Sequence, residues 1–222
     1  KAADDMRERL TGLIGRTAQK VIVCTFHALG VRMLREDGAA LGLKPNFSIL
    51  DASDVLSLLK DCGGTTDAAV AKQWQWTISL WKNQGITPEQ ALAASAANEE
   101  HRSAAIVMQR YHERLTAYQS VDFDDLIGLP LKLLQNHADV REKWQRALGH
   151  VLVDEYQDTN ATQYELLKLL LGPEGIFTAV GDDDQSIYGW RGATLDNLKK
   201  LPVDYPHLKV IKLEQNHRST SA

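Results

Sequence analysis

The sequence predicts an α/β protein in which helices flank a parallel sheet and an all-helical subdomain is inserted into the chain. Short apolar runs rich in β-branched residues alternate with helical segments toward both ends of the sequence, and this alternation is typical of a parallel sheet covered on both faces. From 45 to 118, helix signals follow one another without such a run. We therefore predict one domain from 1–44 and 119–222, with the helical subdomain at 45–118.

The N-terminal part is predicted to contain a helix, a strand and a second helix. Residues 1–10 have a helical pattern, and the run Val21–Val23 is short, apolar and β-branched, as in a fully buried parallel strand. A helix is expected from Ala28 to Arg35, and the glycines at 38 and 42 mark the end of this unit.

The predicted subdomain carries several helix-start signals. Asp51 is a good N-cap, Thr87 is followed by a proline and by Gln90 at the capping-box position, and Asn98 is placed to cap a helix that runs to Tyr118. Large aromatic residues are most often core residues, so we expect four tryptophans to be buried. They are Trp74, Trp76, Trp81 and Trp144.

After Ser120 the alternation of strands and helices returns. Asp122 can cap a helix that contains Leu126 and Ile127. The elements expected after it are a helix at 140–148, a strand at 150–153, a helix at 162–171, a strand at 176–180 and a strand at 208–213.

Composition limits the possible functions only loosely. The 222 residues carry a net charge of −4, so overall charge gives no support for nucleic-acid binding, and any such function must rest on local features. The two cysteines, Cys24 and Cys62, are too few and too far apart for a disulfide framework or a zinc site. Without a membrane-length apolar run or a visible signal peptide, we expect a cytoplasmic protein with no membrane partner.

An acidic pair follows the strand expected at 150–153. In open parallel sheets ligands bind beyond the carboxyl ends of the strands, and there Asp154 could hold Mg²⁺ opposite a nucleotide's phosphates while Glu155 orients or deprotonates a water molecule. Taken alone, the pair is more simply interpreted as an acidic loop after a core strand.

The ends of two further predicted strands favour a nucleotide site over a simple acidic loop. The strand at 176–180 leads into the polar segment 181–193, and the strand at 208–213 leads into 214–220. Polar groups at neighbouring strand ends converge on one edge of a sheet, where phosphates could lie. A two-metal nuclease site is a minor alternative. It would use Asp154, Asp158, Asp182, Asp183 and Asp184.

These segments carry a resemblance to a known family. Residues 154–160, 181–193 and 214–220 resemble motifs II, III and IV of superfamily 1 DNA helicases of the UvrD/Rep/PcrA type, most closely the Rep branch. Residues 1–10 resemble the end of motif Ia, and 24–28 and 121–127 resemble two further segments of the family. The match covers the whole chain in the family's order and implies a partial RecA-like first motor domain that uses ATP and Mg²⁺.

The resemblance assigns roles at the nucleotide. Asp154 would bind Mg²⁺ and Glu155 would act on the hydrolytic water, while Gln185, Arg191 and Arg218 would contact the γ-phosphate. Arginine suits this task because its planar fork makes paired hydrogen bonds to phosphate. His217 stands where the family usually has a tyrosine that stacks on the nucleotide base, so base contacts are expected to differ.

The resemblance also implies a single-stranded DNA surface. Thr25 and His27 would bond DNA phosphates, whereas Phe123, Tyr188 and Trp190 would stack on bases, an interaction of about 1–3 kcal/mol with little sequence preference. The implied activity is ATP-dependent 3′-to-5′ translocation on single-stranded DNA with duplex unwinding, in replication or repair and with replication proteins as possible partners.

One departure limits what we expect of the chain alone. It contains no G-x-x-x-x-G-K-[ST] sequence, which in this family lies upstream of motif Ia. We interpret the chain as a fragment that starts after this loop, and we expect it alone to hydrolyse ATP poorly and not to unwind DNA. The alternative is a non-catalytic module that binds single strands or docks a partner.

Overall fold

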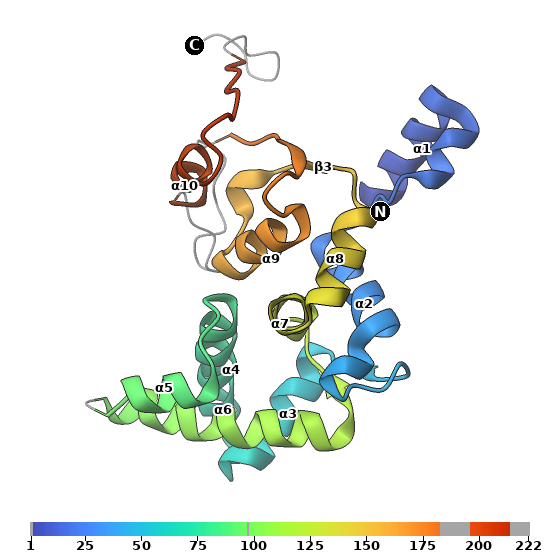
Figure 1. Cartoon of the computed structure of the whole chain (residues 1–222). Coiled ribbons are helices and arrows are strands. Elements are labelled where there is room, and N and C mark those ends of the chain that lie inside the picture. Colours follow the sequence, from blue (N-terminus) through green and yellow to red (C-terminus); the bar gives the residue numbers. More distant parts are fainter. Residues whose placement is uncertain (1, 97, 183–195, 214–222) are drawn as a thin grey trace, which may run out of the picture.

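The computed structural model describes residues 2–96, 98–182 and 196–213, and most of them lie in helices (Figure 1). The α-helices are α1 (Ala2–Ile14), α2 (Phe26–Asp37), α3 (Ala52–Gly63), α4 (Ala68–Asn83), α5 (Pro88–Ala94), α6 (Glu99–Tyr118), α7 (Asp125–Asn136), α8 (Ala138–Ala147), α9 (Ala161–Leu171) and α10 (Asp196–Asp204). Three short 3₁₀ segments are η1 (Gly15–Lys20), η2 (Gly38–Leu41) and η3 (Tyr156–Asp158).

Two small parallel sheets complete the described structure. Strand β1 (Ser48–Ile49) pairs with β2 (Ser120–Val121), and β3 (His150–Val153) pairs with β4 (Ile176–Ala179). The α/β prediction is thus confirmed in a coarse form, as helices with small parallel sheets. The larger RecA-like sheet that the resemblance implies is not seen among the described residues.

Two of the predicted strands are wrong. Residues 21–23 and 208–213 have no strand pairing, although both runs are apolar. Val23 and Leu208 are partly buried, but the other side chains are exposed, with Ile22 at 38% and Ile211 at 71%. A parallel strand needs a neighbour for its backbone hydrogen bonds, and within the described residues β3 and β4 pair with each other alone. An apolar run without such a neighbour stays extended and unpaired.

The other predicted elements are confirmed within a few residues. The capping boxes at Asp51 and Thr87 form, and the side chain of Asn98 accepts hydrogen bonds at the start of α6. These signals succeed because a cap satisfies free N–H groups of its own first turn and needs no distant partner. Asp122 contributes differently: its Oδ1 accepts from the N–H of Asp125 at 2.9 Å, while the N-cap position itself is Asp124.

Helices α3 to α6 share a hydrophobic core of their own. Its buried residues run from Val55 to Leu115, with Trp74 and Trp81 packed against it. The chain enters and leaves this region side by side, because Ser48 pairs with Ser120. The domain boundaries at 45 and 118 remain a prediction.

The expectation for the tryptophans is right for three of the four. Trp144 is buried in the core beneath α2, α7 and α9, and Trp74 and Trp81 are partly buried against the α3–α6 core. Trp76 is 57% exposed, so its assignment to the core is wrong. The reason is its position on α4, which is off the face shared by Trp74, Ile78 and Trp81.

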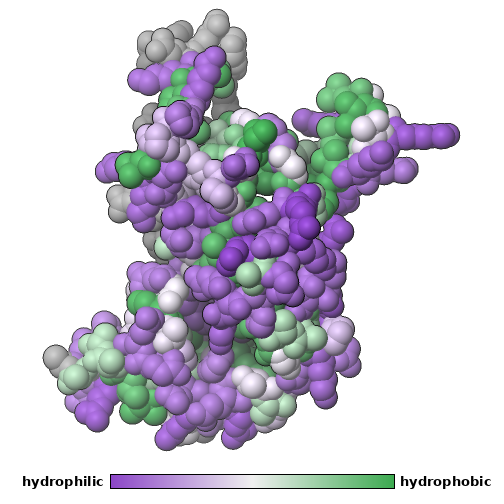
Figure 2. All heavy atoms as spheres, in the orientation of Figure 1, coloured by the Kyte–Doolittle hydropathy of each residue, from purple (hydrophilic) through white to green (hydrophobic). Residues whose placement is uncertain are grey.

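The N-terminal helix projects from the body of the molecule (Figure 1). Its surface includes exposed apolar side chains, among them Met6 and Leu13. Figure 2 shows a hydrophobic area on that arm. Elsewhere the visible face is mostly hydrophilic (Figure 2). Among the described residues, no helix combines the length and the apolar character needed to cross a bilayer.

Helices α2 and α7 approach each other closely at Gly30. A Cβ atom built at this position would lie 1.7 Å from the backbone oxygen of Leu126. Met33 of α2 and Ile127 of α7 are both almost fully buried in the same core. Only glycine allows this contact, which holds the start of α2 against the segment that contains Phe123.

We expect Gly30→Ala to lower the free energy of unfolding by more than about 3 kcal/mol, because the helices must separate to admit the methyl group. The matched control is Gly128→Ala on α7, where an added Cβ would meet nothing within 4 Å. That substitution should leave stability unchanged or raise it by about 0.5–1 kcal/mol. Urea denaturation followed by circular dichroism measures both, and similar values for the two variants would contradict the argument.

Candidate functional site

The ends of β3 and β4 lie side by side. The N–H of Val180 donates to the carbonyl of Val153 at 2.9 Å, and the N–H of Tyr156 donates back to the carbonyl of Val180 at 2.9 Å. The segments that follow the two strands therefore begin at one edge of the sheet. This is the convergence expected for two of the three strand ends, while the third predicted strand does not form.

The acidic pair is exposed at this edge. Asp154 and Glu155 both face solvent, and the Glu155 N–H donates to Asp154 Oδ1 at 3.0 Å. Glu155 has φ of +49°, in the left-handed region that residues other than glycine rarely adopt. Such conformations cost about 1–3 kcal/mol and cluster at functional sites.

A buried glutamine joins the acidic pair to the end of β4. Gln157 is 1% exposed; its Nε2 donates to Glu155 Oε2 at 2.7 Å and its Oε1 accepts from the Asp182 N–H at 3.1 Å. A Cβ at Gly181 would lie 2.9 Å from Gln157 Oε1, so the backbone passes close to this amide. Sequence reasoning missed Gln157, because its role depends on a contact between segments 25 residues apart.

The carboxylates fit one kind of metal site. Magnesium is commonly held by one or two carboxylates together with substrate phosphates and water, and the exposed Asp154 carboxylate at a strand end suits that arrangement. Within 2–96, 98–182 and 196–213, no three His, Cys, Asp or Glu side chains gather as a metal cluster. The metal cluster that a two-metal nuclease would need is thus not seen among the described residues. Two of its five aspartates, Asp183 and Asp184, lie outside them.

Two of the predicted DNA contacts meet in the structure. The ring of His27, at the start of α2, stacks on the ring of Phe123 with a centroid distance of 3.7 Å and an angle of 19°. Phe123 is 57% exposed, so one aromatic surface stays open to solvent. Thr25, the N-cap of α2, is exposed, and its Oγ1 accepts from the N–H of Ala28 at 3.2 Å.

The remaining predicted site residues lie outside the described part of the chain. They are Gln185, Tyr188, Trp190, Arg191, His217 and Arg218.

A largely buried lysine binds the side chains of two aspartates that flank Phe123 in the sequence. Lys82, at the end of α4, places Nζ 2.7 Å from Asp122 Oδ2 and 2.6 Å from Asp125 Oδ1. The Tyr111 hydroxyl also donates to Asp122 Oδ2 at 2.9 Å. All these side chains are largely buried, so the ion pairs are shielded from water and fix the position of the turn that presents Phe123.

The next residue of α4 extends this network to the segment after the acidic pair. Asn83 Nδ2 donates to Asp124 Oδ1 at 2.8 Å, and its Oδ1 accepts from Asn160 Nδ2. The Thr162 hydroxyl donates to the Asn83 carbonyl at 2.9 Å. The C-terminal end of α4 therefore contacts the start of α9 and also the turn at residues 122–124, which we call the Phe123 turn. Only Asn160 could have been noticed beforehand, as half of an Asn-x-x-Gln capping box.

Burial and charge set the proton affinities in this network. Burial, followed by the charge of Asp122, raises the pKa of Asp125 to about 7 despite the attraction of Lys82. Burial alone would also raise the pKa of Asp122, but the charge and hydrogen bonds of Lys82 outweigh it and hold that pKa below its usual range. The charges of Asp122 and Asp125 likewise outweigh burial and raise the pKa of Lys82.

A cavity of about 810 Å³ lies beside this network, between α4 and the Phe123 turn. His27 and Phe123 line it together with Asp158 and Asn160, so it connects the predicted DNA contacts with the segment after Glu155. The buried Asp158 Oδ1 finds no hydrogen-bond partner among the described residues. Burial and the nearby Glu155 raise the pKa of Asp158.

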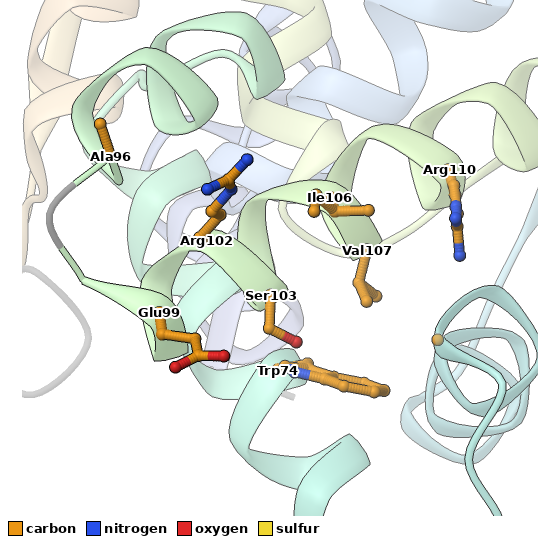
Figure 3. Close-up of a pocket in the computed structure, with 9 residues that line it drawn as sticks. Trp74, Ala96, Glu99, Arg102, Ser103, Ile106, Val107 and Arg110 are labelled. Carbon is orange, nitrogen blue, oxygen red and sulfur yellow. The ribbon is translucent and has the colours of Figure 1, made fainter.

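A second cavity, lined mainly by α6, includes no predicted site residue. Figure 3 shows Glu99, Arg102 and Arg110 of α6 around it, with Trp74 of α4. Arg110 is already engaged, since its Nη1 donates to the carbonyl of Cys62 at 3.1 Å. We therefore place the candidate site at the cavity beside the Phe123 turn and at the adjoining ends of β3 and β4.

Removal of the buried lysine should be strongly destabilising. Lys82→Met leaves Asp122 and Asp125 buried without a counter-charge, and we expect a loss of about 3–5 kcal/mol in the free energy of unfolding. Lys143→Met is the matched control, because Lys143 also pairs with two carboxylates, Glu36 and Asp37, but is 46% exposed. Its loss should stay below about 1 kcal/mol in urea denaturation. Equal losses would mean that burial of the pair is unimportant.

The raised pKa of Asp125 predicts a distinctive pH dependence. Between the ordinary carboxyl pKa of about 4 and the folded value of about 7, the folded state keeps a proton that the unfolded state has lost. The contribution of this group to stability therefore falls as pH rises through that window. Asp125→Asn, which cannot titrate, should remove this fall, whereas the exposed Asp139→Asn should not. An unchanged profile in Asp125→Asn would refute the assignment.

Comparison with known proteins agrees with these features. The family described as "UvrD/REP helicase N-terminal domain" matches residues 1–206. Over 224 residues the chain is 50% identical to "ATP-dependent DNA helicase Rep" of Escherichia coli (strain K12), covering 99% of this chain and 33% of that protein. It is 44% identical over 234 residues to "ATP-dependent DNA helicase UvrD1" of Mycobacterium tuberculosis (strain ATCC 25618 / H37Rv), covering 99% and 30%. The chain spans about a third of the length of these relatives, and it belongs to the UvrD/REP helicase family.

Proposed function

We propose that the chain forms part of the first motor domain of an ATP-dependent 3′-to-5′ DNA helicase, with domain parts at 1–44 and 119–222 and a helical subdomain at 45–118. The observation that carries the proposal is the hydrogen-bonded path between the Phe123 turn and the segment after Glu155, through Asn83. A helicase motor must transmit nucleotide state to its grip on DNA, and a rigid path between two such segments suits that task.

The proposed nucleotide chemistry centres on the carboxylate pair. Asp154 would hold Mg²⁺, and that ion would supply positive charge to neutralise the charge that develops on the transferred phosphoryl group. Glu155 orients the attacking water and accepts its proton, and Gln157 keeps that carboxylate in place through the 2.7 Å hydrogen bond.

Residues outside the described part of the chain complete this scheme. Gln185, Arg191 and Arg218 contact the γ-phosphate of ATP, where guanidinium groups stabilise the charge of the transition state. His217 stacks on the nucleotide base. Cleft closure driven by these contacts, and its release on hydrolysis, would drive translocation.

The proposed DNA surface lies at the His27–Phe123 stack. Thr25 and His27 bond phosphates of a single strand, while Phe123, together with Tyr188 and Trp190, stacks on bases. The open face of Phe123 supports this role, since a ring with 57% exposure is available to a base. The substrates would be single-stranded and partly duplex DNA in the cytoplasm, in replication or repair.

A non-catalytic module that binds single strands or a partner protein remains the second candidate. The exposed His27–Phe123 stack supports a single-strand-binding module as much as it supports a helicase motor, because both bind bases on an aromatic surface. The two differ in the affinity expected of this chain alone.

Fluorescence anisotropy with a labelled single-stranded oligonucleotide tests the proposal. We expect weak binding, because one motor domain supplies only part of the DNA channel, and salt-sensitive binding, because contacts with phosphates release counterions. Phe123→Ala should weaken it about fivefold or more, the equivalent of one lost base stack. Tyr118→Ala is the matched control, since Tyr118 is also 57% exposed but lies at the end of α6. Submicromolar affinity without nucleotide would favour the module, and equal effects of the two substitutions would contradict a role for Phe123.

A further inference from the structure

Among the four tryptophans that the structure describes, Trp76 is the one that is exposed. Trp74, Ile78 and Trp81 turn toward the α3–α6 core, whereas Trp76 is 57% exposed. Trp76, Ser79 and Asn83 follow at i, i+3 and i+7 and so share a different face of α4. This face lines the cavity beside the Phe123 turn. A large, rigid aromatic side chain left open to solvent beside a cavity is a candidate for ligand contact.

The cavity places Trp76 beside the proposed DNA surface. His27 and Phe123 contribute to it from α2 and from the turn before α7, and Trp76 contributes from α4. Both Phe123 and Trp76 are 57% exposed. Two open aromatic side chains on different elements therefore border one space of about 810 Å³, which is continuous with the His27–Phe123 stack.

The polar lining restricts what can enter. Four acidic residues, Asp51, Asp122, Asp124 and Asp158, line the cavity, and their negative charge would repel a phosphate. Four residues with side-chain amides also line it, and an amide or carboxyl oxygen with a remaining lone pair accepts hydrogen bonds from the amino group of a base. The amides belong to Gln75, Asn83, Asn160 and Gln163. This lining suits a planar nucleobase whose phosphates remain outside, better than it suits an anion.

We propose that Trp76 stacks on a nucleobase of single-stranded DNA in the cavity between α4 and the Phe123 turn. The proposal rests on the proposed DNA-binding function and adds to it a contact from the helical region. In this arrangement one base lies against Phe123 and another enters beside Trp76. The strand thus touches α4 directly, next to the Lys82 and Asn83 contacts that hold the turn.

Photocrosslinking tests this contact even when binding is weak. A single-stranded oligonucleotide that carries 5-iododeoxyuridine is irradiated with the whole chain, and the crosslinked residues are identified by mass spectrometry. We expect crosslinks at Trp76 as well as at Phe123. Trp76→Phe should keep the α4 crosslink, and Trp76→Ala should lose it and weaken oligonucleotide binding about fivefold or more, as for one lost stack.

The outcomes separate the two proposals. Crosslinks at Phe123 without any at Trp76, or unchanged affinity in Trp76→Ala, would overturn the contact at Trp76 and leave DNA binding intact. Absence of crosslinks anywhere, with no binding by anisotropy, would overturn both. Lys82 and Tyr111 do not depend on the Trp76 side chain for their hydrogen bonds, so circular dichroism should show the Trp76→Ala protein folded. If the Trp76→Ala protein were unfolded, the crosslinks mapped in the wild type and in Trp76→Phe would still show whether the base contacts position 76.

Discussion

The buried ion network of Lys82 is the constraint on which the arrangement of the site depends. Two carboxylates and an ammonium group lie where water scarcely reaches, so each charge is tolerated only while the others stay within contact distance. A shift of α4 along its axis would leave Asp122 and Asp125 without their partner. The end of α4 is therefore fixed relative to the start of α7, and so is Phe123, which lies between two residues that this helix holds.

A short series of hydrogen bonds connects the Lys82 network to the segment that follows the acidic pair. Asn83 contacts Asp124 on one side and Asn160 on the other, and Asn160 caps α9 directly after the segment that begins at Glu155. Because an amide side chain can donate and accept hydrogen bonds at the same time, Asn83 bonds both the Phe123 turn and the start of α9. The Phe123 turn and the start of α9 therefore share one contact residue at the end of α4.

Sequence reasoning succeeded where structure is local and failed where it is not. Asp51 and Thr87 were recognised as caps, because their hydrogen bonds close within one helical turn. The runs at 21–23 and 208–213 have the composition of strands, but composition cannot supply a neighbour to pair with. Lys82 resembles any basic residue near a helix end, and only the tertiary fold shows that it is buried. Trp76 could have been placed correctly, since it is off the helical face that Trp74 and Trp81 define.

The backbone at Glu155 gives a further reason to connect these features. A left-handed conformation outside glycine persists only when its surroundings determine it, and here three contacts do so: the Tyr156 N–H to Val180, the Gln157 amide on the Glu155 carboxylate and the Asp182 N–H on the same amide. A loop with a merely solvating role would relax to an ordinary conformation. The strain is therefore balanced by contacts that connect the Glu155 carboxylate, through Gln157, to the end of β4.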